Sequence, residues 1–133
     1  ITPESITETL VERDYLKALV MAFRLNELPL IRSVYEAIPP RDIKLVTRSL
    51  PIFYAEVLLN FIAQQMESSP YVEFHLSWIE ALFRAHGRHL RERSGDHAAT
   101  FRSLQKGLTD FQENIVRLFV SFFPSLLLCE KLN

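Results

Sequence analysis

Four histidines and one cysteine are the side chains of this sequence with the imidazole and thiolate groups that zinc sites favour. His86 and His89 stand three residues apart and could share one face of a helix, whereas His75 and His97 stand alone. Zinc would need two more ligands, and Cys129 follows forty residues after His89, with neither Cys-x-x-Cys nor His-Glu-x-x-His spacing. We therefore interpret the histidines as polar or capping residues and predict no metal site and no cofactor.

Side chains for nucleophilic or acid–base catalysis do not form a usable pattern either. Glu73 and His75 flank Phe74, but neighbouring helical residues point in different directions and cannot form a base–nucleophile pair. The sequence has no GxGxxG, GxxxxGK or GxSxG motif. Ser68 and Ser69 border expected helices, where serine usually serves as a cap or turn residue. The sequence therefore predicts a protein that is not an enzyme.

The densest basic stretch extends through the second half of the chain. Its members are Arg84, Arg88, Arg91, Arg93, Arg102 and Lys106. One interpretation is that the five arginines contact the phosphates of RNA. The other is a solvated face with Glu80–Arg84 and Arg88–Glu92 pairs four residues apart, each worth ~0.3 kcal/mol. We favour the second, because no Phe, Tyr or Trp interleaves the arginines between Arg84 and Arg93 as a base-stacking platform requires.

An uncharged run of twelve residues, LFVSFFPSLLLC, covers Leu118–Cys129. A membrane span needs about 20 apolar residues, so the run is too short to be one. Each large apolar side chain left in water would forgo roughly 1.5–3 kcal/mol of burial. We expect burial either in the domain's own core or in a partner chain, with Pro124 breaking the helix. The candidate partner anchors are Phe119, Phe122, Phe123, Leu126 and Leu127.

Composition indicates one globular, helical domain. The 133 residues suffice for a single core, and three glycines are too few for a protein rich in hairpins. Fifteen basic and sixteen acidic residues nearly balance, so charge alone predicts no generic affinity for nucleic acid. The single cysteine excludes an internal disulfide and fits a reducing compartment. The acidic first twenty residues are not a signal peptide, and the missing initial methionine suggests a fragment.

Prolines divide the chain into expected helices. Four of them precede apolar-periodic runs, as expected for proline at the first helical position: Pro29, Pro40, Pro51 and Pro70. Thr2 is expected to cap a helix that starts at Pro3, Gly95 to supply a left-handed cap, and Asp96 to cap the next helix. The expected helices are 3–26 (continuous or broken near Arg13), 29–37, 40–49, 51–67, 70–93, 96–122 and 125–132. Their short links predict an all-α stack of six to seven antiparallel helices, solenoid-like or bundled.

Two of these helices, 51–67 and 70–93, are apolar around most of their circumference. The polar stripe of the first is Glu56, Asn60, Gln64 and Glu67, with Gln65 beside it. The stripe of the second is Glu73, Ser77, Glu80, Arg84, Arg88 and Arg91. Helices of this kind are buried on several sides. We interpret their apolar residues, Phe53 and Trp78 among them, as core; the alternative is that one flank awaits a partner.

Several blocks of the sequence, in order, resemble one family. They are YLKALVMAFRLNE (Tyr15–Glu27), VYEAIPPRDIKLVTRSLP (Val34–Pro51), EFHLSWIEALFRAHGRHL (Glu73–Leu90) and RSLQK (Arg102–Lys106). They resemble the helical C-terminal domain shared by several WD-repeat subunits of the small-subunit processome, including subunits of its UtpB subcomplex. The resemblance does not extend beyond about Gln112, so it assigns no role to the uncharged run.

The resemblance implies a function. Proteins of this family carry N-terminal β-propellers, and their C-terminal helical domains associate with the equivalent domains of sister subunits. The assembly acts in the nucleolus, binds early pre-ribosomal RNA and supports 18S rRNA maturation. We therefore predict that residues 1–133 are one non-enzymatic scaffold domain, without a small-molecule substrate or a membrane. The alternative is a helical RNA-binding module that uses the basic stretch Arg84–Lys106.

Overall fold

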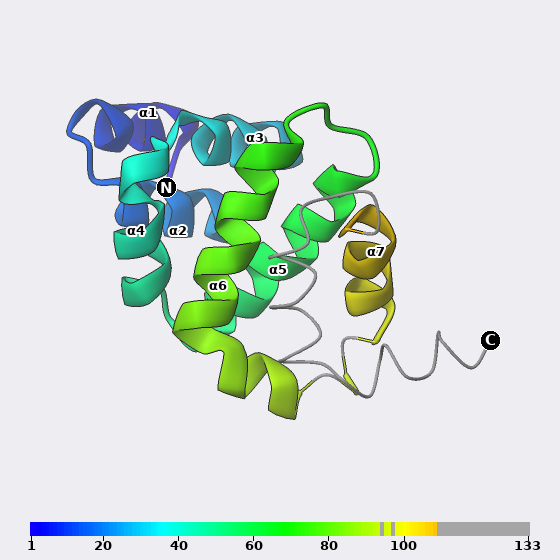
Figure 1. The fold of residues 1–133 in the computed structure, drawn as a ribbon. Coiled ribbons are helices and arrows are strands. Elements are labelled where there is room, and N and C mark those ends of the chain that lie inside the picture. Colours follow the sequence, from blue (N-terminus) through cyan, green and yellow to red (C-terminus); the bar gives the residue numbers. More distant parts are fainter. Residues whose placement is uncertain (94, 97, 109–133) are drawn as a thin grey trace, which may run out of the picture.

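The computed structural model describes residues 1–93, 95–96 and 98–108, and within them the chain is all-helical (Figure 1). The helices are α1 (Pro3–Val11), α2 (Tyr15–Leu25), α3 (Leu28–Ala37), the 3₁₀ helix η1 (Pro40–Asp42), α4 (Ile43–Ser49), α5 (Ile52–Met66), α6 (Val72–Glu92) and α7 (Ala98–Leu108). The expected all-α class is confirmed. The expected helix 125–132, and the part of 96–122 beyond residue 108, lie outside the described residues.

The segment expected at 3–26 is two helices, broken near Arg13. Thr2 caps α1 as predicted: its Oγ1 accepts the Ser5 N–H at 3.1 Å, and the Ser5 Oγ accepts the Thr2 N–H at 3.0 Å. Arg13 then adopts a left-handed φ of 62°, which reverses the chain between the two helices. Asp14 caps α2.

The prolines mark helix starts to within two residues, but only some occupy the first helical position. Pro3 begins α1, whereas Pro29 is the second residue of α3 and Pro70 precedes α6 by two residues. Pro51 is the N-cap of α5, with an extended ψ of 147°. Its carbonyl accepts the Ala55 N–H at 3.0 Å, because an N-cap carbonyl already receives the first helical hydrogen bond.

The end of α6 differs from the prediction. Gly95 does not supply a left-handed cap, since no glycine in the described part of the chain has a positive φ. Arg93 ends the helix instead, and its N–H bonds to the His89 carbonyl at 3.1 Å. The Asp96 N–H continues the turn by bonding to the Arg93 carbonyl at 3.0 Å. Whether Asp96 caps α7 depends on residue 97, which lies outside the described residues.

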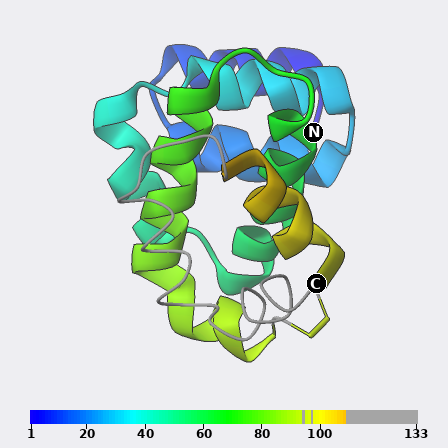
Figure 2. The same cartoon turned by 45° about the vertical axis from the view of Figure 1, so that its right-hand side comes forward.

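The helices pack around the pair α5 and α6. Helix α4 packs on α6 and helix α7 on α5, so that α4 and α7 lie on opposite sides of the pair (Figures 1 and 2). Helices α1, α2 and α3 form a group at one end, with α2 in contact with both of the others.

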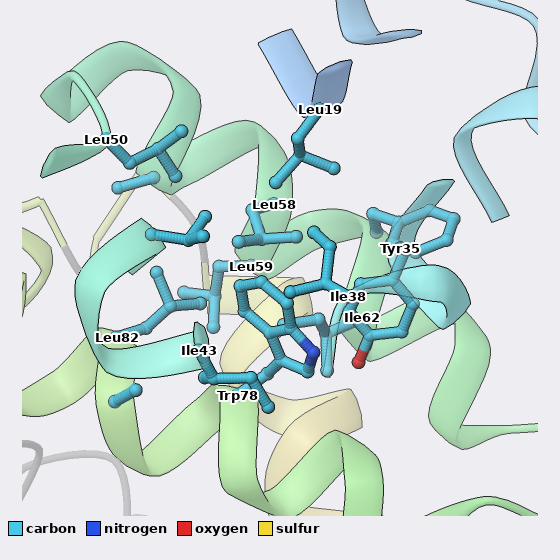
Figure 3. Packing of buried hydrophobic residues seen from close by; sticks show 14 of the residues in the cluster. Leu19, Tyr35, Ile38, Ile43, Leu50, Leu58, Leu59, Ile62, Trp78 and Leu82 are labelled. Carbon is cyan, nitrogen blue, oxygen red and sulfur yellow. The ribbon is translucent and has the colours of Figure 1, made fainter. Parts of the chain in front are cut away.

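The core is centred on Trp78 of α6, which is fully buried. Figure 3 shows its indole among Ile43 of α4, Ile62 of α5 and Tyr35 of α3. The ring centroids of Tyr35 and Trp78 lie 5.2 Å apart. The core interpretation of α5 and α6 is thus confirmed for most of their apolar residues. It is wrong for Phe53, which lies in the first turn of α5 and is 66% exposed.

Candidate interaction surfaces

The described histidines join helices to one another. His86 lies at a kink of α6 (φ −129°, ψ 15°), and its Nε2 is 2.7 Å from the carbonyl oxygen of Thr47. That carbonyl belongs to the last turn of α4, where it also accepts the Leu50 N–H at 3.4 Å, so His86 adds a contact from α6 to the C-terminal end of α4. His89 turns instead toward α5, with its Nε2 3.2 Å from Glu56 Oε1. His86 and His89 therefore face different helices; His97 lies outside the described residues.

His75 is buried against Tyr35 (1% exposed), and its Nδ1 is 2.8 Å from the Tyr35 hydroxyl. Burial lowers the pKa of His75 below its usual value of 6.5. Burial, with a smaller contribution from the charge of Glu36, raises the pKa of Tyr35 far above its usual range. Both groups are therefore neutral at pH 7, and they form a hydrogen bond between α3 and α6.

The depressed pKa of His75 predicts acid sensitivity. Between the folded-state pKa and about 6.5, the unfolded chain binds more protons than the folded chain, so the free energy of unfolding should fall as the pH drops below about 6.5. His75 should contribute no pH dependence above that value. Urea denaturation at pH 7.5, 6.5 and 5.5 measures the effect. His75→Gln, which does not titrate, should reduce the slope; an unchanged slope would contradict this assignment.

Glu56 and Asn60 of the polar stripe of α5 bond to neighbouring helices, whereas Gln64 and Glu67 of the same stripe are exposed. Glu56 is 9% exposed, and its Oε1 receives Arg93 Nε at 3.1 Å in addition to His89. Asn60 accepts a hydrogen bond from Thr100 of α7. Gln65 Oε1 accepts one from Arg32 Nε of α3 at 3.2 Å. These polar contacts join α5 to α6, α7 and α3.

The structure divides the predicted arginine cluster. Arg93 is engaged by Glu56 and by Asp96, whose Oδ2 lies 3.3 Å from its Nε. The Glu80–Arg84 pair is confirmed at 3.1 Å, whereas no ion pair joins Arg88 to Glu92, both of which the structure describes. Exposed arginines remain on α6 and α7: Arg84, Arg88, Arg91 and Arg102. The sequence reasoning therefore overestimated how many of these cations are available to one ligand.

Two hollows that share Lys44, Ala81 and Arg84 lie between α4 and α6, and we call them together the basic groove. The first, of about 400 Å³, is lined by Lys44, Thr47, Arg48, Ala81, Arg84 and Ala85. The second, of about 250 Å³, is lined by Pro40, Ile43, Lys44, Ser77, Glu80, Ala81 and Arg84. Sequence reasoning included Arg84 but missed Lys44 and Arg48. Their i,i+4 spacing on an expected helix was the available signal, but nothing in the sequence placed that helix beside Arg84.

A third hollow of about 310 Å³ lies between α5 and α7, around Asn60, Gln64 and Ser103.

Exposed apolar side chains occur at the start of α5, where Ile52 is 50% and Phe53 66% exposed. The predicted partner anchors Phe119, Phe122, Phe123, Leu126 and Leu127 lie outside the described residues.

The described residues bring no three side chains of His, Cys, Asp or Glu together in a way that could hold a metal ion. Among the helices described, none has both the length and the apolar character needed to cross a membrane.

Comparison with known proteins identifies the family. Periodic tryptophan protein 2 of Saccharomyces cerevisiae is 41% identical to this chain over 116 residues. The periodic tryptophan protein 2 homologue of Mus musculus is 38% identical to it over 118 residues, and that of Neurospora crassa is 45% identical over 119 residues. These alignments cover 87–89% of this chain but 13% of each relative, so the chain spans about 13% of their length. The AFRLNE and VYEAIP blocks predict this similarity, which is confirmed. Residues 26–121 also match the model of the Dip2/Utp12 family, and the chain belongs to that family.

Proposed function

We propose that this chain is a non-enzymatic scaffold domain through which a larger WD-repeat protein assembles with sister subunits of the small-subunit processome. In this proposal residues 1–133 form a single C-terminal interaction domain that acts in the nucleolus during 18S rRNA maturation. Membership of the Dip2/Utp12 family is the observation that carries it. The structural contacts of the described histidines support a non-enzymatic role, since they join helices.

The proposed contacts are with equivalent helical domains of sister subunits. The anchors predicted from the sequence, Phe119 to Leu127, remain part of the proposal. The exposed Ile52 and Phe53 offer a second apolar position for a partner, because large apolar side chains gain free energy when they leave water.

Deletion of this segment from the full-length protein in cells tests the proposal. Affinity purification of the deleted protein should recover markedly less of the sister subunits, and 18S rRNA precursors should accumulate. A full-length protein with Trp78→Ala, which damages the fold but keeps the segment, should behave similarly. Normal recovery of the sister subunits together with normal 18S rRNA levels would refute the proposal.

The alternative function, RNA binding by this domain, is supported by the exposure of Arg84, Arg88, Arg91 and Arg102. It is weakened by the engagement of Arg93 with Glu56 and Asp96. Filter binding of RNA at two salt concentrations separates the two functions. Phosphate contacts predict an affinity that falls steeply with salt, by about one unit of log–log slope per contact.

A further inference from the structure

We propose that the basic groove between α4 and α6 binds an acidic segment of a partner protein. This binding site goes beyond the association of helical domains proposed above and does not depend on it. Its walls carry three cations, Lys44, Arg48 and Arg84, and one carboxylate, that of Glu80. Its floor is made of small or apolar residues, among them Ala81.

The cations on α4 lack carboxylate partners. Lys44 and Arg48 are exposed, lie one turn apart, and have no Asp or Glu oxygen within 4.0 Å in the part of the chain that the structure describes. Like charges at i,i+4 repel each other on a helix. An acidic ligand would remove this repulsion and would make ion pairs that the isolated chain does not make.

Arg84 forms an exposed ion pair on the α6 side of the groove. Its Nε lies 3.1 Å from Glu80 Oε1, and the N–H groups of both terminal nitrogens make no hydrogen bond to any described residue. These groups form a fork that matches a carboxylate in a bidentate arrangement. The groove therefore presents one guanidinium fork on α6 and two cations on α4.

The floor and dimensions favour a peptide over RNA. The distance along α4 and η1 from Pro40 to Arg48 is ~12 Å at the helical rise, which accommodates about four residues of extended chain. Ala81 and Ala85 leave room for the aliphatic part of side chains on such a segment. Among the described residues that line the groove, none has an aromatic side chain on which a base could stack.

Fluorescence anisotropy with the 133-residue chain tests the proposal. The probes are a fluorescein-labelled eight-residue peptide of glutamate and leucine, the same peptide with lysine in place of glutamate, and a labelled single-stranded RNA of eight nucleotides. The acidic peptide should bind, with an affinity that falls as salt is added. Lys44→Glu combined with Arg48→Glu should weaken it at least tenfold.

The matched control is Lys17→Glu combined with Arg24→Glu. It also replaces one exposed lysine and one exposed arginine on one helix, α2, and changes the net charge equally. It should change the affinity less than threefold. Ala85→Tyr keeps every charge but fills the groove, and it should also weaken binding at least tenfold. Circular dichroism confirms that each variant is folded.

Three results would overturn the proposal. The first is an equal loss of affinity in the α4 variant and the α2 control, which would indicate attraction to net charge alone. The second is failure of the acidic peptide to bind while the RNA binds and loses affinity in the α4 variant, which would assign the groove to phosphate. The third is unchanged peptide binding by Ala85→Tyr, which would place the peptide outside the groove.

Discussion

Replacement of Trp78 with alanine should lower the free energy of unfolding by about 3–5 kcal/mol. Trp78 of α6 is fully buried among residues of α3, α4 and α5, and its ring contacts Tyr35, whose centroid is 5.2 Å away. Truncation removes this burial and leaves a cavity that close-packed neighbours fill only in part. Domains are stable by only about 5–15 kcal/mol, so the variant should unfold at a much lower denaturant concentration.

Phe53→Ala is the matched control for this prediction. It also truncates an aromatic side chain to alanine, but at a position that is 66% exposed, where substitutions usually change stability by about 0.5 kcal/mol or less. Guanidinium denaturation followed by circular dichroism measures both. Equal destabilisation by the two variants would contradict the packing described for the core.

Changing Phe122 and Phe123 together to aspartate should abolish association with a second Dip2/Utp12-family domain while the helical content is retained. Both residues lie outside the described residues, and the prediction comes from the uncharged run that contains them. Two carboxylates in an apolar interface would lose their hydration without a compensating partner, which costs several kcal/mol each. Co-purification and circular dichroism of the same samples provide the two measurements.

The outcomes of this double substitution separate core from interface. Loss of helicity would show that the phenylalanines are core residues, and the interface prediction would be wrong. Phe53→Asp should be made in parallel, because Phe53 is the most exposed of the phenylalanines whose burial the structure describes. If Phe53→Asp abolishes association and the C-terminal pair does not, the interface lies at the start of α5.

Much of the fold was predictable because local signals set the helices. Proline and the Thr2 cap marked starts to within two residues, and the apolar faces of α5 and α6 indicated two buried helices. Details that depend on packing were not predictable. Whether the chain broke at Arg13 was left open, because arginine carries no preference for a left-handed turn.

The polar residues of α5 show more clearly that contacts set by helix packing cannot be predicted from the sequence pattern. Glu56 and Asn60 fit the pattern of a solvent stripe, yet each bonds to a residue more than thirty positions farther along the chain. Periodicity identifies a polar face but does not distinguish water from a polar partner. The basic groove depends likewise on the packing of α4 against α6, which brings Lys44 beside Arg84 from forty residues away.

The central claim, that this domain assembles with related helical domains, is tested most directly by its mass in solution. Light scattering should be recorded across a concentration series for the chain alone and mixed with Dip2/Utp12-family domains of sister subunits. We predict that one mixture gives a species with the summed mass of both chains, and that this species persists at high salt because apolar contacts are weakly screened. Separate monomers in every mixture and at every concentration would contradict the claim.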